Sequence, residues 1–218
     1  MGDTRSSVEE VPGEPWRTGD PHRSMVRGVD TGPWDVRENG WQSTRLIDLG
    51  GLLIPDEDGI EVQLGTMRAS SDLVAATVLR DSCALQLQAF HAMRSGAWDR
   101  TRKKLLSNTF NPKNRFLERD GRFGAELRCE IEVETASDRR KMTAVCFLGC
   151  EGPGWLLRGV LSGAIAFDEP PAEWFSSYFG RVVVAPWNGR PLVSASPTGF
   201  GSLQPDLDGK PILLRLPD

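Results

Sequence analysis

The chain has 218 residues, with 26 Lys and Arg against 30 Asp and Glu, and a formal net charge of -4. This length allows one large domain or two small ones, and a hydrophobic content of 39% is enough for an ordinary core. The composition excludes a collagen, a long coiled coil and a fully disordered chain. It points to no reaction.

The distribution of apolar residues predicts a protein without a membrane partner. No run of about 18 apolar residues occurs, so no transmembrane helix is expected. The polar N-terminus does not have the pattern of a signal peptide. The chain has 4 cysteines, too few for a disulfide framework in a chain of this size. We therefore expect a cytoplasmic protein.

Residues 1–41 have the composition of a flexible N-terminal tail, because they are rich in Gly and Pro and carry almost no periodic apolar pattern. Three tryptophans, Trp16, Trp34 and Trp41, nevertheless lie in this range. A tryptophan can bury a large apolar area, so each either clamps the tail onto its own domain or anchors a partner. Docking onto the domain is favoured for Trp34 and Trp41, and Trp16 is left open.

Residues 42–185 are predicted to form an α+β domain that begins with strands. The expected strands of its first half are residues 46–54 with a kink at Gly50-Gly51, residues 60–64, residues 73–79 and residues 83–90. Residues 83–90 alternate most regularly, with Leu85 and Leu87 on one face and Gln86 and Gln88 on the other. This alternation predicts that one side of the sheet meets water.

The period then changes to that of a helix. The elements expected in the second half are a helix from Ser95 to Asn108, a hairpin of residues 116–119 and 123–133 across Asp120-Gly121, a hairpin of residues 143–148 and 155–161, a short helix through Trp174 and Tyr178, and residues 182–184 as a strand that closes the sheet. The sum is a single α+β domain with a largely antiparallel sheet and two short helices.

Residues 186–218 form a Pro- and Gly-rich C-terminal extension that ends in an apolar stretch, residues 212–216. An exposed apolar strand would be an unpaired edge. We therefore expect this end to dock on the sheet edge or over the core, with a partner-binding role as the alternative.

Several strings together resemble an uncharacterised actinobacterial family, the domain of unknown function 3710. They are Gly32–Val36, Leu85–Phe90, Ser95–Asp99, Gly121–Leu127, Gly152–Gly163 and the closing Leu-Arg-Leu-Pro. The resemblance implies an intracellular protein of a high-GC bacterium, without an established activity or catalytic residues to carry over. The order of elements is also similar to Mog1/PsbP-like folds, which mostly serve as binding or assembly modules. In the family, the segment after the start of the tryptophan helix is usually more acidic than it is here.

Candidate chemistry is sparse. The cysteines lack the paired short spacings of a zinc site, so no metal is predicted. The glycines of residues 152–163 precede a strand, whereas phosphate loops precede a helix, so no nucleotide cofactor is expected. His91 is the only histidine of the predicted domain, and Cys129 or Cys146 on a neighbouring strand could reach it. A strand-end histidine without a catalytic role is favoured over this pair.

The charge of residues 94–122 stands out, because nine basic residues against three acids give a local net charge of +6 in a chain whose remainder sums to -10. The candidate binding residues are Arg100, Arg102, Lys103, Lys104, Lys113, Arg115 and Arg119. A solvated basic face is favoured. One alternative is nucleic-acid binding, in which the interleaved phenylalanines would stack on bases. The other is binding of an acidic protein partner or an anionic ligand. Nucleic-acid binding requires Arg102, Lys103 and Lys104 to share one exposed face with Arg115 or Arg119.

The sequence therefore favours a non-enzymatic binding or adaptor module that engages a protein partner. The contact is expected through the basic helix, the tryptophan-bearing tail or the Gln86/Gln88 face. The alternatives are binding of nucleic acid or an anionic ligand through residues 94–122, and an enzyme with a site near His91.

Overall fold

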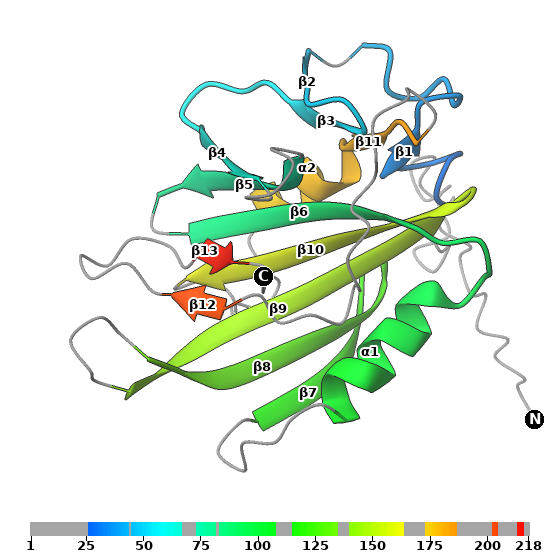
Figure 1. The fold of residues 1–218 in the computed structure, drawn as a ribbon. Helices are drawn as coiled ribbons and strands as arrows, with labels where there is room; N and C mark the ends of the chain where they lie inside the picture. The colour runs from blue at the N-terminus through cyan, green and yellow to red at the C-terminus, as the bar shows by residue number, and fades with distance from the viewer. Residues whose placement is uncertain are drawn as a thin grey trace, which may run out of the picture.

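The computed structural model of the chain describes residues 26–43, 45–66, 73–81, 83–107, 115–134, 140–163, 173–186, 202–204 and 213–215. These residues form two short helices and mostly antiparallel strands (Figure 1), which confirms the predicted α+β class. The helices are α1 (Ala97–Ser107) and α2 (Glu173–Gly180). Neither is long and apolar enough to cross a membrane.

Seven strands form the main sheet. They are β4 (Glu61–Thr66), β5 (Leu73–Arg80), β6 (Cys83–His91), β7 (Arg115–Gly121), β8 (Gly124–Glu134), β9 (Arg140–Gly152) and β10 (Trp155–Gly163). Their order across the sheet is β4-β5-β6-β10-β9-β8-β7, with antiparallel pairing between all neighbours. The β9–β10 turn is at Pro153-Gly154, where Gly154 has a φ of 83° that suits a type II turn. The β7–β8 turn is at Arg122-Phe123, two residues beyond the predicted position, because Gly121 still pairs with Gly124.

A smaller sheet lies beside the main one and contains β1 (Trp34–Asp35), β2 (Leu46–Asp48), β3 (Leu52–Pro55) and β11 (Val183–Val184), in the order β1-β11-β3-β2. The single strand predicted for residues 46–54 is in fact a hairpin, since Gly50 adopts a φ of 96° and reverses the chain. The prediction that residues 182–184 close the main sheet is also wrong. They pair with β3 and, in parallel, with β1.

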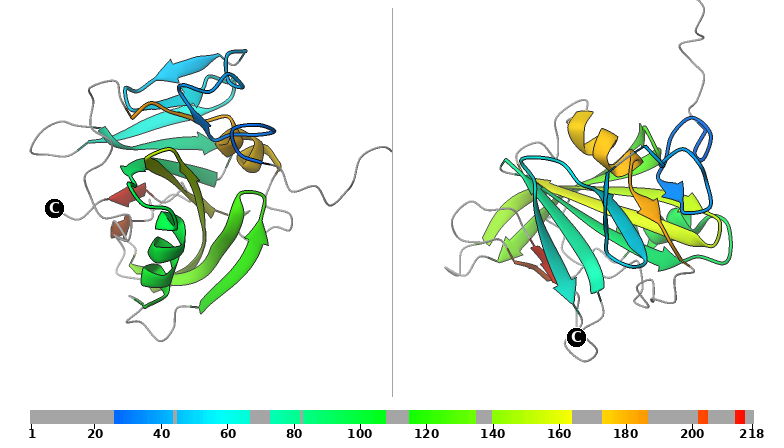
Figure 2. Two further views of the ribbon diagram at one scale, coloured as in Figure 1. Left: turned by 90° about the vertical axis from the view of Figure 1, so that its right-hand side faces the viewer. Right: turned by 90° about the horizontal axis from the view of Figure 1, so that it is seen from above.

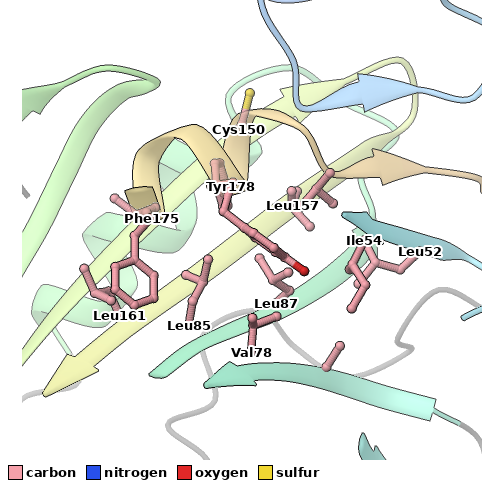
Figure 3. Close-up of a cluster of buried hydrophobic side chains, with 14 of the residues drawn as sticks. Leu52, Ile54, Val78, Leu85, Leu87, Cys150, Leu157, Leu161, Phe175 and Tyr178 are labelled. Carbon is pink, nitrogen blue, oxygen red and sulfur yellow. The ribbon is translucent and has the colours of Figure 1, made fainter. Parts of the chain in front are cut away.

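The larger hydrophobic core lies between the main sheet, α2 and the smaller sheet (Figure 3). Leu85 and Leu157 from neighbouring strands point at Tyr178 of α2, and Ile54 of β3 lies beside it. The Tyr178 hydroxyl donates a 2.7 Å hydrogen bond to the carbonyl oxygen of Pro55, so a buried polar group is satisfied across the two layers. Full burial of each leucine or isoleucine side chain in this core contributes about 1.5–3 kcal/mol to the free energy of folding.

The opposite face of the main sheet carries a second core under α1. Trp98 and Leu105 of the helix pack with Phe90, Phe147 and other side chains of the sheet. Figure 2 shows the sheet curving around this helix. The short strands β12 (Ser202–Gln204) and β13 (Leu213–Arg215) pair with each other on the same side of the sheet, with β12 near β8 and β13 near β6 (Figure 1).

Gln86 and Gln88 do not meet water as predicted. Their exposed fractions are 4% and 1%, although they do lie opposite Leu85 and Leu87 on β6. The alternation correctly indicated the strand and its two faces. The polar face is nevertheless covered. The sheet curves, and helix α1 and the strands β12 and β13 lie on that side of it (Figures 1 and 2). A partner therefore does not reach these two glutamines directly.

The segment before β2 is part of the fold from residue 26 onward, so the tail predicted for residues 1–41 overlaps the first strand. Trp34 is buried, and its partner residue in the parallel pairing is Val183. Asp35 is buried as well and accepts a 2.9 Å hydrogen bond from Nε1 of Trp155 and a 2.7 Å hydrogen bond from Nε of Arg37. These contacts join the beginning of the described chain to the end of the β9–β10 hairpin.

Candidate binding cleft between strand β6 and helix α1

A cleft opens where β6 ends and the chain turns into α1. Phe90 is the last buried residue of β6 and lies on the face that carries α1. Its neighbour across the strands is Leu156 of β10, so the two side chains form one apolar floor. The loop that follows is held by a 3.0 Å hydrogen bond from the Ala92 N–H to the Gly154 carbonyl, and Gly96 takes a φ of 75° before the helix begins.

Helix α1 is fixed above this floor by three contacts of its first turn. Glu151, at the β9–β10 hairpin, accepts a 2.8 Å hydrogen bond from the backbone N–H of Trp98 and so caps the helix from a distant part of the chain. Nε1 of Trp98 donates a 2.6 Å hydrogen bond to the Ala125 carbonyl. The ring lies on Gly149, which has no side chain to hold it off. The helix is therefore positioned by sequence-distant groups.

The cleft has a volume of about 360 Å³. Its lining residues are Phe90, His91, Ala92, Met93, Arg94, Ala97, Arg100, Thr101, Lys104 and Leu156. The floor is apolar, the rim is basic, and no carboxylate or cysteine is among these lining residues. Such a site suits an anionic group carried on an apolar body.

The basic residues of the rim differ in their roles. Arg100 donates hydrogen bonds of 2.7 Å and 3.1 Å to the carbonyl oxygens of Ser95 and Arg94, so it braces the loop. The exposed side chains of Arg94 and Lys104 have no ion pair with any residue that the structure describes. These two cations are therefore available to a ligand.

The other predicted residues of the basic segment point elsewhere. Arg102 is paired with Asp99 at 3.0 Å and with Glu118 of β7 at 2.5 Å, so its charge is neutralised. Lys103 is exposed and outside the cleft lining. Its position on α1 is 100° from those of Arg102 and Lys104, so the three side chains diverge.

Strand β7 separates the remaining cations from α1. Glu118 contacts Arg102 of the helix and Phe116 packs with the core under α1. Alternate strand residues point to opposite faces, so Arg115 and Arg119 point away from that side. The nucleic-acid hypothesis requires one exposed face shared by Arg102, Lys103 and Lys104 with Arg115 or Arg119. The described residues do not form such a face.

Three predicted residues remain. Lys113 and Trp16 lie outside the described residues. Trp41 is partly buried, and its Nε1 is buried without a hydrogen-bond partner among the described groups. Together with the burial of Trp34, this places both described tryptophans of the predicted tail against the domain.

The structure does not support the pairing of His91 with a cysteine. His91 is exposed at the cleft, whereas Cys83, Cys129, Cys146 and Cys150 are all buried. Burial raises the pKa of the Cys146 and Cys150 thiols to about 12, so both stay protonated and poorly nucleophilic near neutral pH. The four buried thiols therefore do not share the exposed surface on which His91 lies.

Sequence reasoning does not identify two residues of interest. Arg94 belongs to the basic segment, but nothing in the sequence shows that the chain turns there and leaves its side chain at a cleft. Arg158 lies on the same face as Leu156 and Val160 and has an exposed fraction of 1%. The sequence of β10 could have drawn attention to Arg158, because a charged residue on an otherwise apolar strand face is unusual.

Comparison with curated proteins finds no match. Among solved structures, the chain is similar to the solution structure of cyanobacterial PsbP (CyanoP) from Synechocystis sp. PCC 6803, with 12% identity and a TM-score of 0.36. That similarity covers 65% of this chain and 91% of the other. The family model described as a protein of unknown function (DUF3710) matches residues 32–192. This range includes the cleft, α1 and the whole main sheet, and the chain therefore belongs to the DUF3710 family.

Proposed function

We propose that the protein is a non-enzymatic intracellular binding module, and that it takes an acidic segment of a protein partner into the cleft between β6 and α1. The observation that carries this proposal is the pairing of an apolar floor, Phe90 and Leu156, with two available cations, Arg94 and Lys104. An aliphatic or aromatic side chain of the partner fits the floor. A neighbouring carboxylate fits the cations of the rim.

The binding free energy of such a contact depends on how exposed the ion pairs at the rim are to solvent. Each exposed ion pair contributes about 1 kcal/mol or less, so the cations confer selectivity for acidic sequences and the floor supplies most of the affinity. Reversal of both charges replaces attraction with repulsion and is expected to weaken binding about tenfold or more.

The test is an affinity purification of tagged full-length protein from its native host, with and without nuclease. Three forms are compared: the unsubstituted protein, the double variant Arg94→Glu/Lys104→Glu, and the matched control Lys103→Glu. The control makes the same charge change as Lys104→Glu at the neighbouring position of α1, outside the cleft lining. We expect a protein partner that survives nuclease, stays with the control and is lost from the double variant.

Three results contradict the proposal. A partner that the double variant retains would place the contact outside the cleft. Hits that disappear after nuclease would favour the nucleic-acid alternative, whose affinity falls steeply with salt. Recovery of the protein with a small anionic ligand in place of a partner would keep the cleft but replace the partner class.

A further inference from the structure

A stripe of buried polar side chains crosses the face of the main sheet that carries α1. It comprises Thr77 of β5, Gln86 and Gln88 of β6, and Arg158 and Ser162 of β10. None of the five has an exposed fraction above 4%. Three adjacent strands therefore present hydrogen-bonding groups at a place where an antiparallel sheet with a covered face ordinarily presents apolar ones.

Arg158 is the central residue of this polar stripe. It lies opposite Gln88 in the strand register and donates a hydrogen bond from Nη2 to the Gln88 Oε1 atom. Its guanidinium also lies 5.4 Å from the centre of the Phe90 ring. Burial lowers the pKa of Arg158 to about 10, yet the group stays charged near neutral pH. A guanidinium has five N–H donors, and a charge inside a protein requires oxygen acceptors close to it.

The paired strands β12 and β13 lie on this side of the sheet. β13 is near β6, which carries Gln86 and Gln88, and β12 is near β8 (Figures 1 and 2). Beyond Pro186, these two strands are the part of the C-terminal extension that the structure describes. The extension also contains the carboxylates of Asp206 and Asp208 in the sequence between the two strands.

We propose that the polar stripe is a docking site for the chain's own C-terminal segment, residues 197–218, and that Arg158 receives carboxylate oxygens from that segment. The stripe supplies the donors, and the two strands bring the segment to it. A partner that uses this face of the sheet has to displace the segment first. The rim of the cleft is formed by other residues, and the stripe meets the cleft only where Arg158 lies over the floor residue Phe90.

The test starts from full-length protein with a specific protease site inserted after Ser196. After cleavage, the C-terminal fragment is expected to stay with the body of the protein in size-exclusion chromatography. Arg158→Gln is expected to release it about tenfold faster or more, because the charged donor is lost. Arg94→Gln makes the same substitution at the cleft and is expected to leave retention unchanged.

Since Arg158→Gln can also destabilise the sheet, a second variant acts from the other side of the contact. Asp206→Asn/Asp208→Asn leaves the sheet untouched and is expected to speed release to a similar degree, with an unaltered circular dichroism spectrum. Prompt loss of the fragment from the unsubstituted protein would overturn the proposal. The proposal would also be overturned if the acid and arginine variants retained the fragment for as long as the unsubstituted protein does, or if the cleaved protein dimerised through the exposed face.

Discussion

The indole of Trp98 lies directly on Gly149, so close that a Cβ at position 149 would be 2.0 Å from the ring. Gly149→Ala must therefore displace the tryptophan and the first turn of α1. We expect a loss of about 1–3 kcal/mol in the free energy of unfolding, measured by urea denaturation, with the helix shifted away from the cleft. Gly65→Ala is the control, because its Cβ would have its nearest neighbour at 3.6 Å. Equal effects of the two substitutions would contradict this account.

The pH dependence of stability should reflect Asp35. Burial by itself would raise the pKa of its carboxyl, but hydrogen bonds from Arg37 and Trp155 outweigh that effect, and the pKa is lowered from its ordinary value of 3.8. Its stabilisation is therefore present above pH 3.8 and is lost as the pH falls through the lower, folded-state value. Asp35→Asn is expected to cost about 1–3 kcal/mol at pH 7 and to flatten the acid limb of the stability curve.

The measurement is chemical denaturation between pH 2 and pH 7, with Asp58→Asn as a control at an exposed carboxylate. If Asp35→Asn and the unsubstituted protein lose stability in parallel as the pH falls, the Asp35–Trp155 contact has no such role.

Thiol reactivity offers an inexpensive check of the core. All four cysteines are buried and free, and burial raises the pKa of the Cys129 thiol along with those of Cys146 and Cys150. We expect the native protein to react with an aromatic disulfide reagent at neutral pH only as fast as it unfolds. Addition of denaturant should then release four equivalents at once. A rapidly reacting thiol in the native state would reopen the question of a cysteine nucleophile near His91.

Tyr178 is the chain's single tyrosine, so its ionisation can be followed without ambiguity. Burial raises the pKa of its phenol above the ordinary value of 10.0, and the hydroxyl is bonded to the Pro55 carbonyl. Absorbance of the phenolate should therefore appear at high pH only together with unfolding, and stability should fall as the pH rises above 10. Tyr178→Phe removes this signal and should cost about 1 kcal/mol at neutral pH. A phenolate that forms in the folded protein would contradict the contact.

The sequence allowed the strands of the main sheet to be predicted well, because alternation and turn residues are local signals. In β6 it separated Leu85 from Gln86 correctly. It did not show which face is covered, since that depends on elements far away in the chain. The same limitation explains β11: three consecutive valines indicate a strand, but only the three-dimensional structure shows that its neighbours are β3 and the two-residue strand at Trp34.

The candidate site was partly predictable for a related reason. The basic segment was evident as a charge anomaly, and Arg100 and Lys104 do lie at the cleft. The directions of its side chains were not evident, because they depend on how α1 and β7 lie in space and on the pairing of Arg102 with Glu118. The apolar floor brings Phe90 together with Leu156, from strands joined only through the intervening helix and three further strands.

The parallel pairing of Trp34 with Val183 has a consequence for how the protein is made. A ribosome releases the N-terminal part of a chain first, and domains fold as their segments emerge. Trp34 and Asp35 are among the first described residues to leave the ribosome, yet Trp155 and β11 are translated much later. Trp34 and Asp35 are thus synthesised early but reach their final positions late. The smaller sheet is complete only when almost the whole family-matched region has been translated.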